Sequence, residues 1–257
     1  NGLHLFYGLG AFIAPVLVAQ AILWSGDINW AYWLLALLIL PIALWEARLP
    51  SPPIQAEGQD GQAARLNYGL ILPVVVFFFL NVGAEASFGG WIFTYARALN
   101  LGSDTGAAIL NSMFWGAFTL GRLAAIPIAA RFQARWILLA DLLVCLASLA
   151  LLLAGRSVYP AALVGVIGTG LSMASIFPTT MTLAGRNMPI NGRTTGLFFV
   201  GVSAGTMFFP WLIGQLFEPV GPQVTMQIIL ACLAGALAVY GVMMLRFNRQ
   251  AQPLPPS

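Results

Sequence analysis

Charged residues are scarce in this chain. Asp, Glu, Lys and Arg together make up 7% of its 257 residues, whereas roughly a quarter of a soluble domain is charged. Hydrophobic residues make up 60%, and the mean hydropathy is +0.87. A soluble core of this length could not bury so much apolar surface. The composition therefore excludes an ordinary soluble domain and indicates that the lipid bilayer is the solvent.

Lysine is absent, and histidine and cysteine are rare. The one histidine, His4, lies at an expected helix end, and one histidine cannot build a zinc site of the usual kind. No Gly-rich loop with its Lys is present, so there is no ATP-binding motif. Cys145 and Cys232 lie inside apolar runs, which predicts reduced, hydrophobic side chains. We therefore expect a protein that is not an enzyme, with no cofactor, no metal and no nucleic-acid partner.

Most of the sequence consists of long apolar runs. A spanning helix needs about 20 predominantly apolar residues, and the chain has eight such runs. They predict an all-α, polytopic membrane protein with eight transmembrane helices, at 3–24, 29–46, 68–96, 105–128, 135–154, 158–184, 194–217 and 223–246. A Pro-, Gln- and Gly-rich stretch without an apolar period, 47–67, separates the first two helices from the last six.

This separation defines the expected domains. Residues 1–46 would be the last two helices of an N-terminal transport bundle, and 47–67 a linker. Residues 68–247 would form a six-helix C-terminal bundle, and 248–257 a polar tail. The layout is that of a twelve-helix carrier without its first four helices, so we expect the chain to be incomplete.

Arginine placement predicts the orientation. If the first helix begins in the cytoplasm, the outer connections carry only Arg97 and Arg156. The cytoplasmic connections and the span ends beside them then carry all the other arginines except Arg122, which are Arg48, Arg65, Arg131, Arg135, Arg186, Arg193, Arg246 and Arg249. Because positive residues favour the cytoplasmic side, we expect the linker and the C-terminus there, in a plasma (inner) membrane.

Small residues predict close helix packing. Gly201 and Gly205 form a Gly-x-x-x-Gly pair, and Gly165, Gly168 and Gly170 lie together on another predicted span. Such residues let helix backbones approach one another where lipid supplies no hydrophobic drive.

Glu85 is the most informative charge at membrane depth. The nearest arginine along the sequence, Arg97, is about 18 Å further along the same helix. A buried acid without a partner tends to carry a proton, and acids inside membranes are functional by default. Three roles stay open: proton coupling, sodium binding, and acceptance of hydrogen bonds from substrate hydroxyls. The alternative is a protonated glutamate with a purely structural role.

The residues around Glu85 indicate a polar cavity. Asn81 lies one turn before it on the same helix face, and Trp91 follows it. Polar groups beside flat aromatic faces suit a neutral sugar or polyol. Trp91 could equally belong to the aromatic belt at the outer interface, and for Tyr95 we favour the belt. The Gly-Gly pair before Trp91 predicts a break in the helix that would expose backbone groups to the cavity.

The span at 105–128 adds Asn111 and Trp115, again one turn apart. We expect both to line the same cavity. Hydroxyl groups inside membranes usually just form hydrogen bonds across helices, so the other polar residues are weaker candidates. These are Gln20, Thr169, Ser172, Ser175, Thr179 and Thr180.

Arg122 and Asp141 form a second charged feature. Each lies nine or ten residues from the turn between two antiparallel spans, so the two should lie at the same depth. Isolated charges are costly there, and an ion pair is expected. We favour a structural pair that holds the hairpin together. The other interpretation is a gate that breaks when the cytoplasmic side opens.

Several segments resemble the major facilitator superfamily. GAFTLGRLAAIPIAARF, which contains Arg122, resembles the degenerate loop motif between the eighth and ninth helices of that family. VGAEASFGGWIFTYA, MASIFPTTMTLAG and TTGLFFVGVSAGTMFFPWLIG look like its sugar-transporting branch, which includes fucose permease and sodium-dependent glucose carriers. The resemblance covers nearly the whole chain, as the fifth to twelfth helices. It implies two six-helix halves, a central cavity and rocker-switch alternating access.

One segment departs from the drug–proton antiporters of this superfamily. GLGAFIAPVLV, with Gly10, Ala14 and Pro15, only partly resembles their fifth-helix motif, because Val18 and Ala19 stand where a Gly pair follows. The departure favours uptake of a substrate over drug efflux.

We therefore expect a secondary active carrier for a small polar solute, above all a sugar, working by proton- or sodium-coupled symport. Glu85 would bind the coupling ion or the solute, and Asn81, Trp91, Asn111 and Trp115 would line the cavity. Two alternatives stay open: an efflux antiporter for amphipathic compounds, and a non-transporting membrane sensor or assembly protein. The expected partners are the lipid bilayer and the solute, and we expect the full-length carrier to be monomeric.

Overall fold

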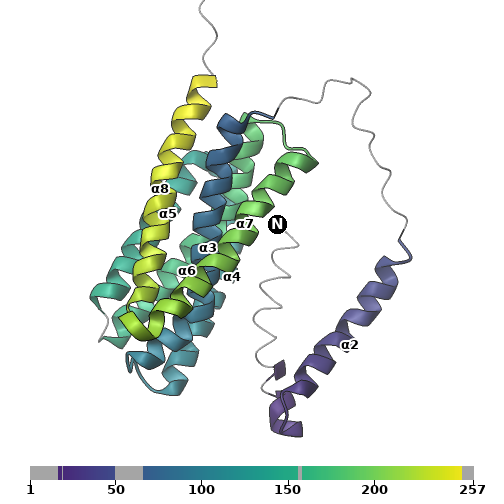
Figure 1. Cartoon of the computed structure of the whole chain (residues 1–257), viewed down its shortest axis with the longest axis vertical. Helices are drawn as coiled ribbons and strands as arrows, with labels where there is room; N and C mark the ends of the chain where they lie inside the picture. The colour runs from purple at the N-terminus through teal and green to yellow at the C-terminus, as the bar shows by residue number, and fades with distance from the viewer. Residues whose placement is uncertain (1–16, 19, 50–65, 156–157, 251–257) are drawn as a thin grey trace, which may run out of the picture. The chain divides into compact units, whose positions relative to one another are not determined.

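The computed structural model describes residues 17–18, 20–49, 66–155 and 158–250, and no strand occurs in these ranges. Its long helices are α2 (Asn29–Glu46), α3 (Tyr68–Ala98), α4 (Asp104–Arg131), α5 (Ala134–Ala154), α6 (Tyr159–Asn187), α7 (Gly192–Val220) and α8 (Val224–Gln250) (Figure 1). All seven are long and apolar enough to cross a membrane. The prediction of an all-α, multi-pass membrane protein is confirmed. The predicted span at 3–24 lies mostly outside the described residues. The part of it that the structure describes, 17–18 and 20–24, is helical.

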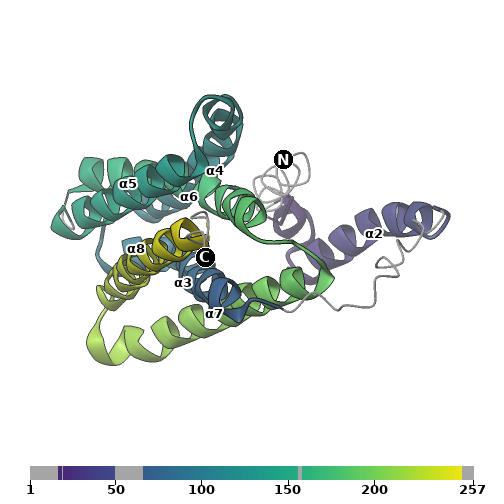
Figure 2. The same ribbon diagram turned by 90° about the horizontal axis from the view of Figure 1, so that it is seen from above.

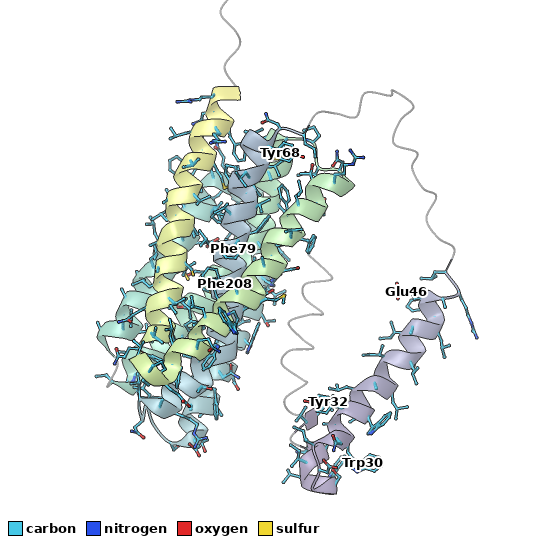
Figure 3. All side chains as sticks on the ribbon, viewed as in Figure 1. Trp30, Tyr32, Glu46, Tyr68, Phe79 and Phe208 are labelled. Atoms are coloured by element: carbon cyan, nitrogen blue, oxygen red, sulfur yellow. The ribbon has the colours of Figure 1, made fainter. Side chains whose placement is uncertain are left out.

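The chain divides into two compact units. Residues 9–65 form the first, which contains α2, and α3 to α8 belong to the second. Almost all of α2 is exposed, including the side chains of Trp30, Tyr32 and Glu46 (Figure 3). Just before α2, the backbone N–H and the side-chain amide of Asn29 donate to Asp27 at 3.0 and 3.1 Å. These hydrogen bonds lower the pKa of Asp27 below its ordinary value.

The six helices of the second unit form two rows of three. α6 packs between α4 and α5, and α3 packs between α7 and α8 (Figure 2). The rows meet through contacts of α3 with α4 and α6 and of α5 with α8. The two central helices, α3 and α6, are therefore the most deeply covered, and half or more of their most apolar stretch is buried.

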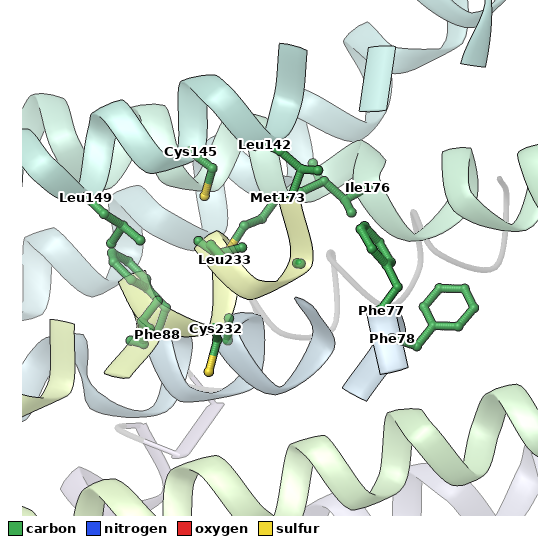
Figure 4. Packing of buried hydrophobic residues seen from close by; sticks show 14 of the residues in the cluster. Phe77, Phe78, Phe88, Leu142, Cys145, Leu149, Met173, Ile176, Cys232 and Leu233 are labelled. Atoms are coloured by element: carbon green, nitrogen blue, oxygen red, sulfur yellow. The ribbon is translucent and has the colours of Figure 1, made fainter. Parts of the chain in front are cut away.

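Aromatic and aliphatic side chains fill the space between the rows. Phe77 and Phe78 of α3 are fully buried, as are Leu142 of α5 and Met173 of α6 (Figure 4). The two cysteines, at 145 and 232, are free and lie in the same core. Their prediction as reduced, hydrophobic side chains is confirmed.

Glycines allow the closest helix contacts, as predicted. On α7, Gly201 and Gly205 lie directly against the carbonyl oxygens of Val75 and Phe79 on α3, and a Cβ at either position would clash. Gly170 of α6 makes a similar contact, because a Cβ there would lie 2.6 Å from a backbone carbonyl oxygen of α4. These contacts bring the backbone of α7 against that of α3, and the backbone of α6 against that of α4.

Arginines gather at one end of this bundle. Consecutive helices run in opposite directions (Figure 1), so the ends of α4, α6 and α8 meet the starts of α5 and α7. This end carries Arg131, Arg135, Arg186, Arg193, Arg246 and Arg249. At the other end, Arg97 pairs with Asp104 at 2.8 Å on the surface. This uneven distribution of arginines between the two ends matches the one expected from the sequence. Which end faces the cytoplasm stays a prediction.

Two local predictions are wrong. α3 runs through Gly89 and Gly90 without a break. The absence of a side chain at Gly89 instead makes room for the ring of Trp115, whose Cζ2 lies 2.6 Å from where a Cβ would be. Tyr95 is fully buried and does not belong to an interfacial belt. It continues the buried face of α3 that Phe88 begins, at helical spacing.

Candidate functional site

One half-buried stripe of α3 carries Glu85. The residues toward the core on either side of it, Ala84 and Phe88, are fully buried, whereas Gly90 is exposed. Glu85 itself is half-buried. Glu85 thus lies on the border between the packed core and the more exposed side of α3.

A cation on α4 acts on Glu85. The guanidinium of Arg122 interacts electrostatically with the Glu85 carboxyl, and it lies 4.6 Å above the centre of the Phe118 ring. An aromatic face stabilises a cation at this distance. The sequence prediction missed this neighbour because it measured distance along α3 alone. The position of Arg122 on the adjacent predicted span is the sequence signal that could have identified it.

The same face of α4 carries the other predicted residues. Asn111, Trp115, Phe118 and Arg122 follow one another at the spacing of a single helix face. Trp115 packs against Gly89 of α3 and lies 5.7 Å from the Phe118 ring. Asn111 is half-buried, and within the described part of the chain its Oδ1 has no hydrogen-bond partner. α4 therefore presents Arg122 beside Glu85, and Trp115 and Asn111 further along the same face.

Asn81 lies deeper than its neighbours. It is fully buried, and neither its Oδ1 nor its Nδ2 finds a hydrogen-bond partner among the described residues. A buried amide without a partner is costly. Asn81 thus shares the helix with Glu85 but points into the core, where a small shift of α3 or a hydrogen-bonding solute could satisfy it.

Trp91 belongs to the opposite flank of α3. Its ring lies 5.1 Å from that of Phe217 on α7, and it covers Gly214 of the same helix. Trp115 contacts α3 from α4 instead. The structure therefore places the two predicted tryptophans on different sides of α3, with Glu85 one to two turns before both contacts.

Asp141 is held by a hydroxyl. The Oγ of Ser175 on α6 donates to Oδ2 of Asp141 on α5. Asp141 and Glu85 both act electrostatically on the buried Cys145, so the two acids face one region of the core. Arg122 lies over Phe118 and interacts with Glu85, and its ion pair with Asp141 stays a prediction.

The weaker candidates mostly bond within their own helices. The hydroxyls of Thr169, Ser172 and Thr180 donate to carbonyls four residues earlier, at 2.8, 2.6 and 2.7 Å. Gln20 is exposed. Within the described ranges, no three His, Cys, Asp or Glu side chains gather into a metal-binding group. His4, Gly10, Ala14, Pro15 and residues 50–65 lie outside the described part.

Several known proteins with similar sequences are named as glucose transporters. No protein-family model matches the chain. It is 31% identical over 247 residues to "Sodium-dependent glucose transporter 1" of Xenopus laevis, covering 84% of this chain and 50% of the relative. It is 26% identical to the human protein of the same name, covering 95% and 54%. The chain thus spans about half the length of these relatives.

Other comparisons agree. The human "Major facilitator superfamily domain-containing protein 4A" is 26% identical over 181 residues, which are 69% of this chain and 34% of that protein. Among solved structures, the major facilitator superfamily transporter FucP in its outward conformation matches 97% of this chain and 67% of that chain, with a TM-score of 0.67 and 17% identity. In sequence, the chain is similar to proteins named sodium-dependent glucose transporters and major facilitator superfamily domain-containing proteins, and in fold it is similar to a major facilitator superfamily transporter.

Proposed function

We propose that this chain is the solute-binding part of a secondary active carrier that moves a sugar across a membrane by sodium- or proton-coupled symport. One observation carries the proposal. Glu85 lies half-buried on α3 and interacts with Arg122 of α4, and the same face of α4 carries Trp115 and Asn111 further along the helix, in a chain with relatives named sodium-dependent glucose transporters.

The chemistry of this face suits a sugar. A carboxylate and the amide oxygen of Asn111 can accept hydrogen bonds from hydroxyl groups, and Trp115 offers a flat apolar face for the C–H side of a sugar ring. Specific sites combine such an apolar surface with a few polar groups that fix orientation. Asn81 and Trp91, on other sides of α3, would support the cavity in another state of the alternating-access cycle.

Glu85 would also link solute movement to an ion. Its carboxyl group interacts with the Arg122 guanidinium in this structure. A sodium ion or a proton that neutralises the carboxylate would weaken that interaction and free Arg122. Coupling needs a ligand that favours one conformation over the other. A Glu85 carboxylate that interacts with Arg122 in one conformation and with the ion in the other would provide that difference in binding free energy.

The test is transport by the protein expressed from its complete coding sequence and reconstituted in proteoliposomes. Uptake of labelled hexoses, deoxyhexoses and polyols would be measured with an inward sodium gradient, an inward proton gradient, or neither. We expect one hexose to accumulate above its outside concentration under one of the two gradients, and that gradient identifies the coupling ion.

Other outcomes are equally informative. If a sugar equilibrates across the membrane but does not accumulate under either gradient, the proposal of sugar transport stands and the proposal of ion coupling is wrong. No flux of any sugar, together with movement of lipophilic cations, would overturn the proposal in favour of an efflux antiporter. No solute flux at all would favour a sensor or assembly protein.

A further inference from the structure

A basic pocket opens at the arginine-rich end of the six-helix bundle, far along the helices from Glu85. It has a volume of about 250 Å³ and lies between the start of α5, the end of α6 and the end of α8. Its polar lining comprises Gln133, Arg135, Arg186, Asn187 and Asn248. The proposed sugar site uses none of these residues.

The pocket has the charge of an anion site. Its two charged side chains are arginines from different helices, and no acidic residue lines it. Arg186 is exposed, and the described part of the chain gives it no ion-pair partner. Arg135 is also exposed, and its guanidinium lies 5.4 Å from the centre of the Trp136 ring. Two guanidinium groups on one pocket match the oxygens of a phosphate group.

The amides that complete the lining support the same ligand. The Nδ2 of Asn187 donates to the carbonyl of Leu183 at 2.8 Å, which fixes its side chain at the pocket wall. Tyr240 of α8 donates to the carbonyl of Arg135 at 2.8 Å and ties the start of α5 to α8. These two hydrogen bonds hold Asn187 and the start of α5 in place before a ligand arrives.

An apolar crevice continues from this pocket. It has a volume of about 70 Å³ and lies between the end of α4, the start of α5 and α6. Ala134 and Arg186 line both cavities, and Ala129, Ile137 and Pro178 supply apolar walls. Thr179 and Thr182 also line the crevice, and the hydroxyl of Thr182 donates to the carbonyl of Pro178 at 2.9 Å. The crevice reaches back along α6 as far as Pro178, about two turns from Arg186 toward the middle of the membrane. A charged pocket at a helix end with an apolar extension along the spans has the polarity of a lipid.

We propose that Arg135 and Arg186 bind the phosphate group of an anionic molecule, and that this molecule is a phospholipid whose acyl chain enters the crevice beside Ala129. The position of the pocket at the ends of three spanning helices puts it at headgroup level. A free phosphate ion is the other source of the same chemistry, and the experiment below separates the two.

The test measures lipid binding to the whole chain, purified in a neutral detergent, by native mass spectrometry. Phosphatidylglycerol is titrated against phosphatidylcholine. Since each charge-assisted hydrogen bond contributes about a factor of ten or more to affinity, Arg135→Gln combined with Arg186→Gln should weaken phosphatidylglycerol binding at least tenfold. Arg193→Gln is the matched control, because Arg193 is exposed at the same end and lines neither cavity.

The outcomes separate the two sources. If Ala129→Trp, which fills the crevice, also weakens phosphatidylglycerol binding, and excess inorganic phosphate does not displace the lipid, a phospholipid occupies the site. If inorganic phosphate displaces the lipid and Ala129→Trp has no effect, the ligand is a free phosphate. Equal phosphatidylglycerol binding by the double arginine variant and by Arg193→Gln, with equal thermal unfolding midpoints, would overturn the proposal.

Discussion

A single carboxyl group carries most of the expected ion coupling. Glu85→Gln keeps the shape and hydrogen-bonding ability of the side chain but removes its charge. We expect the variant to lose gradient-driven accumulation of sugar by at least tenfold while it still exchanges internal for external sugar. The measurement is a paired uptake and counterflow assay in proteoliposomes.

Glu218→Gln serves as the control, because Glu218 is exposed near the end of α7 and far in sequence from the site. It should accumulate sugar as the parent protein does. Normal accumulation by Glu85→Gln would show that another group couples the ion.

At this scale the sequence predicts residues better than it predicts their partners. It identifies Glu85 and Trp115, which the structure places at the contact of α3 and α4, and Asn111, which shares the face of α4 that carries Trp115, while their roles stay a prediction. It does not predict that Ser175 holds Asp141, because that contact depends on how α6 is rotated against α5. Neither does it predict that Trp91 turns to α7, since its nearest ring neighbour, Phe217, is more than one hundred residues away.

Helix α7 depends on close contact with α3. Gly205→Ala would push a methyl group into the carbonyl of Phe79, and overpacking of this kind costs about 1–3 kcal/mol. We therefore expect the free energy of unfolding to fall by about that amount. The measurement is the thermal unfolding midpoint of the purified protein in detergent.

The matched control lies on the same helix. At Gly196 a new methyl group would have nothing within 4 Å of it, so Gly196→Ala should leave stability unchanged or raise it by up to about 1 kcal/mol through helix propensity. Equal effects of the two substitutions would mean that the contact between α3 and α7 does not limit packing.

Elements are the scale at which sequence reasoning succeeds most. The apolar runs predict the bounds of α2 to α8 to within a few residues, because a spanning helix must be apolar over its whole length. The predicted break at Gly89 fails for a specific reason. A glycine that weakens a helix and a glycine that admits a tryptophan from α4 look the same in one sequence.

Across the whole molecule, the arginine-rich end should face the cytoplasm. We expect Gly192→Cys, at the start of α7, to react with a membrane-impermeant maleimide only after cells are permeabilised. Thr105→Cys, at the opposite end of the bundle, should react in intact cells. Both positions are exposed. The reverse labelling pattern would invert the proposed orientation.

The native cysteines should not obscure this measurement. Cys145 and Cys232 are 0% and 4% exposed, so the parent protein should remain unlabelled and serve as the blank. Strong labelling of the parent would show instead that the bundle opens far enough to expose its core.

The glycine contacts between α7 and α3 also restrict how the molecule can move. Residues one turn apart share a helix face, so sliding α7 along α3 by one turn would bring Phe209 to the carbonyl of Phe79 in one direction and Leu197 to the carbonyl of Val75 in the other, where glycines now fit. The two helices therefore have one register and must travel as a single rigid piece. A change of access from one side of the membrane to the other then has to come from rotation of larger blocks, with the flexible joints placed outside this pair.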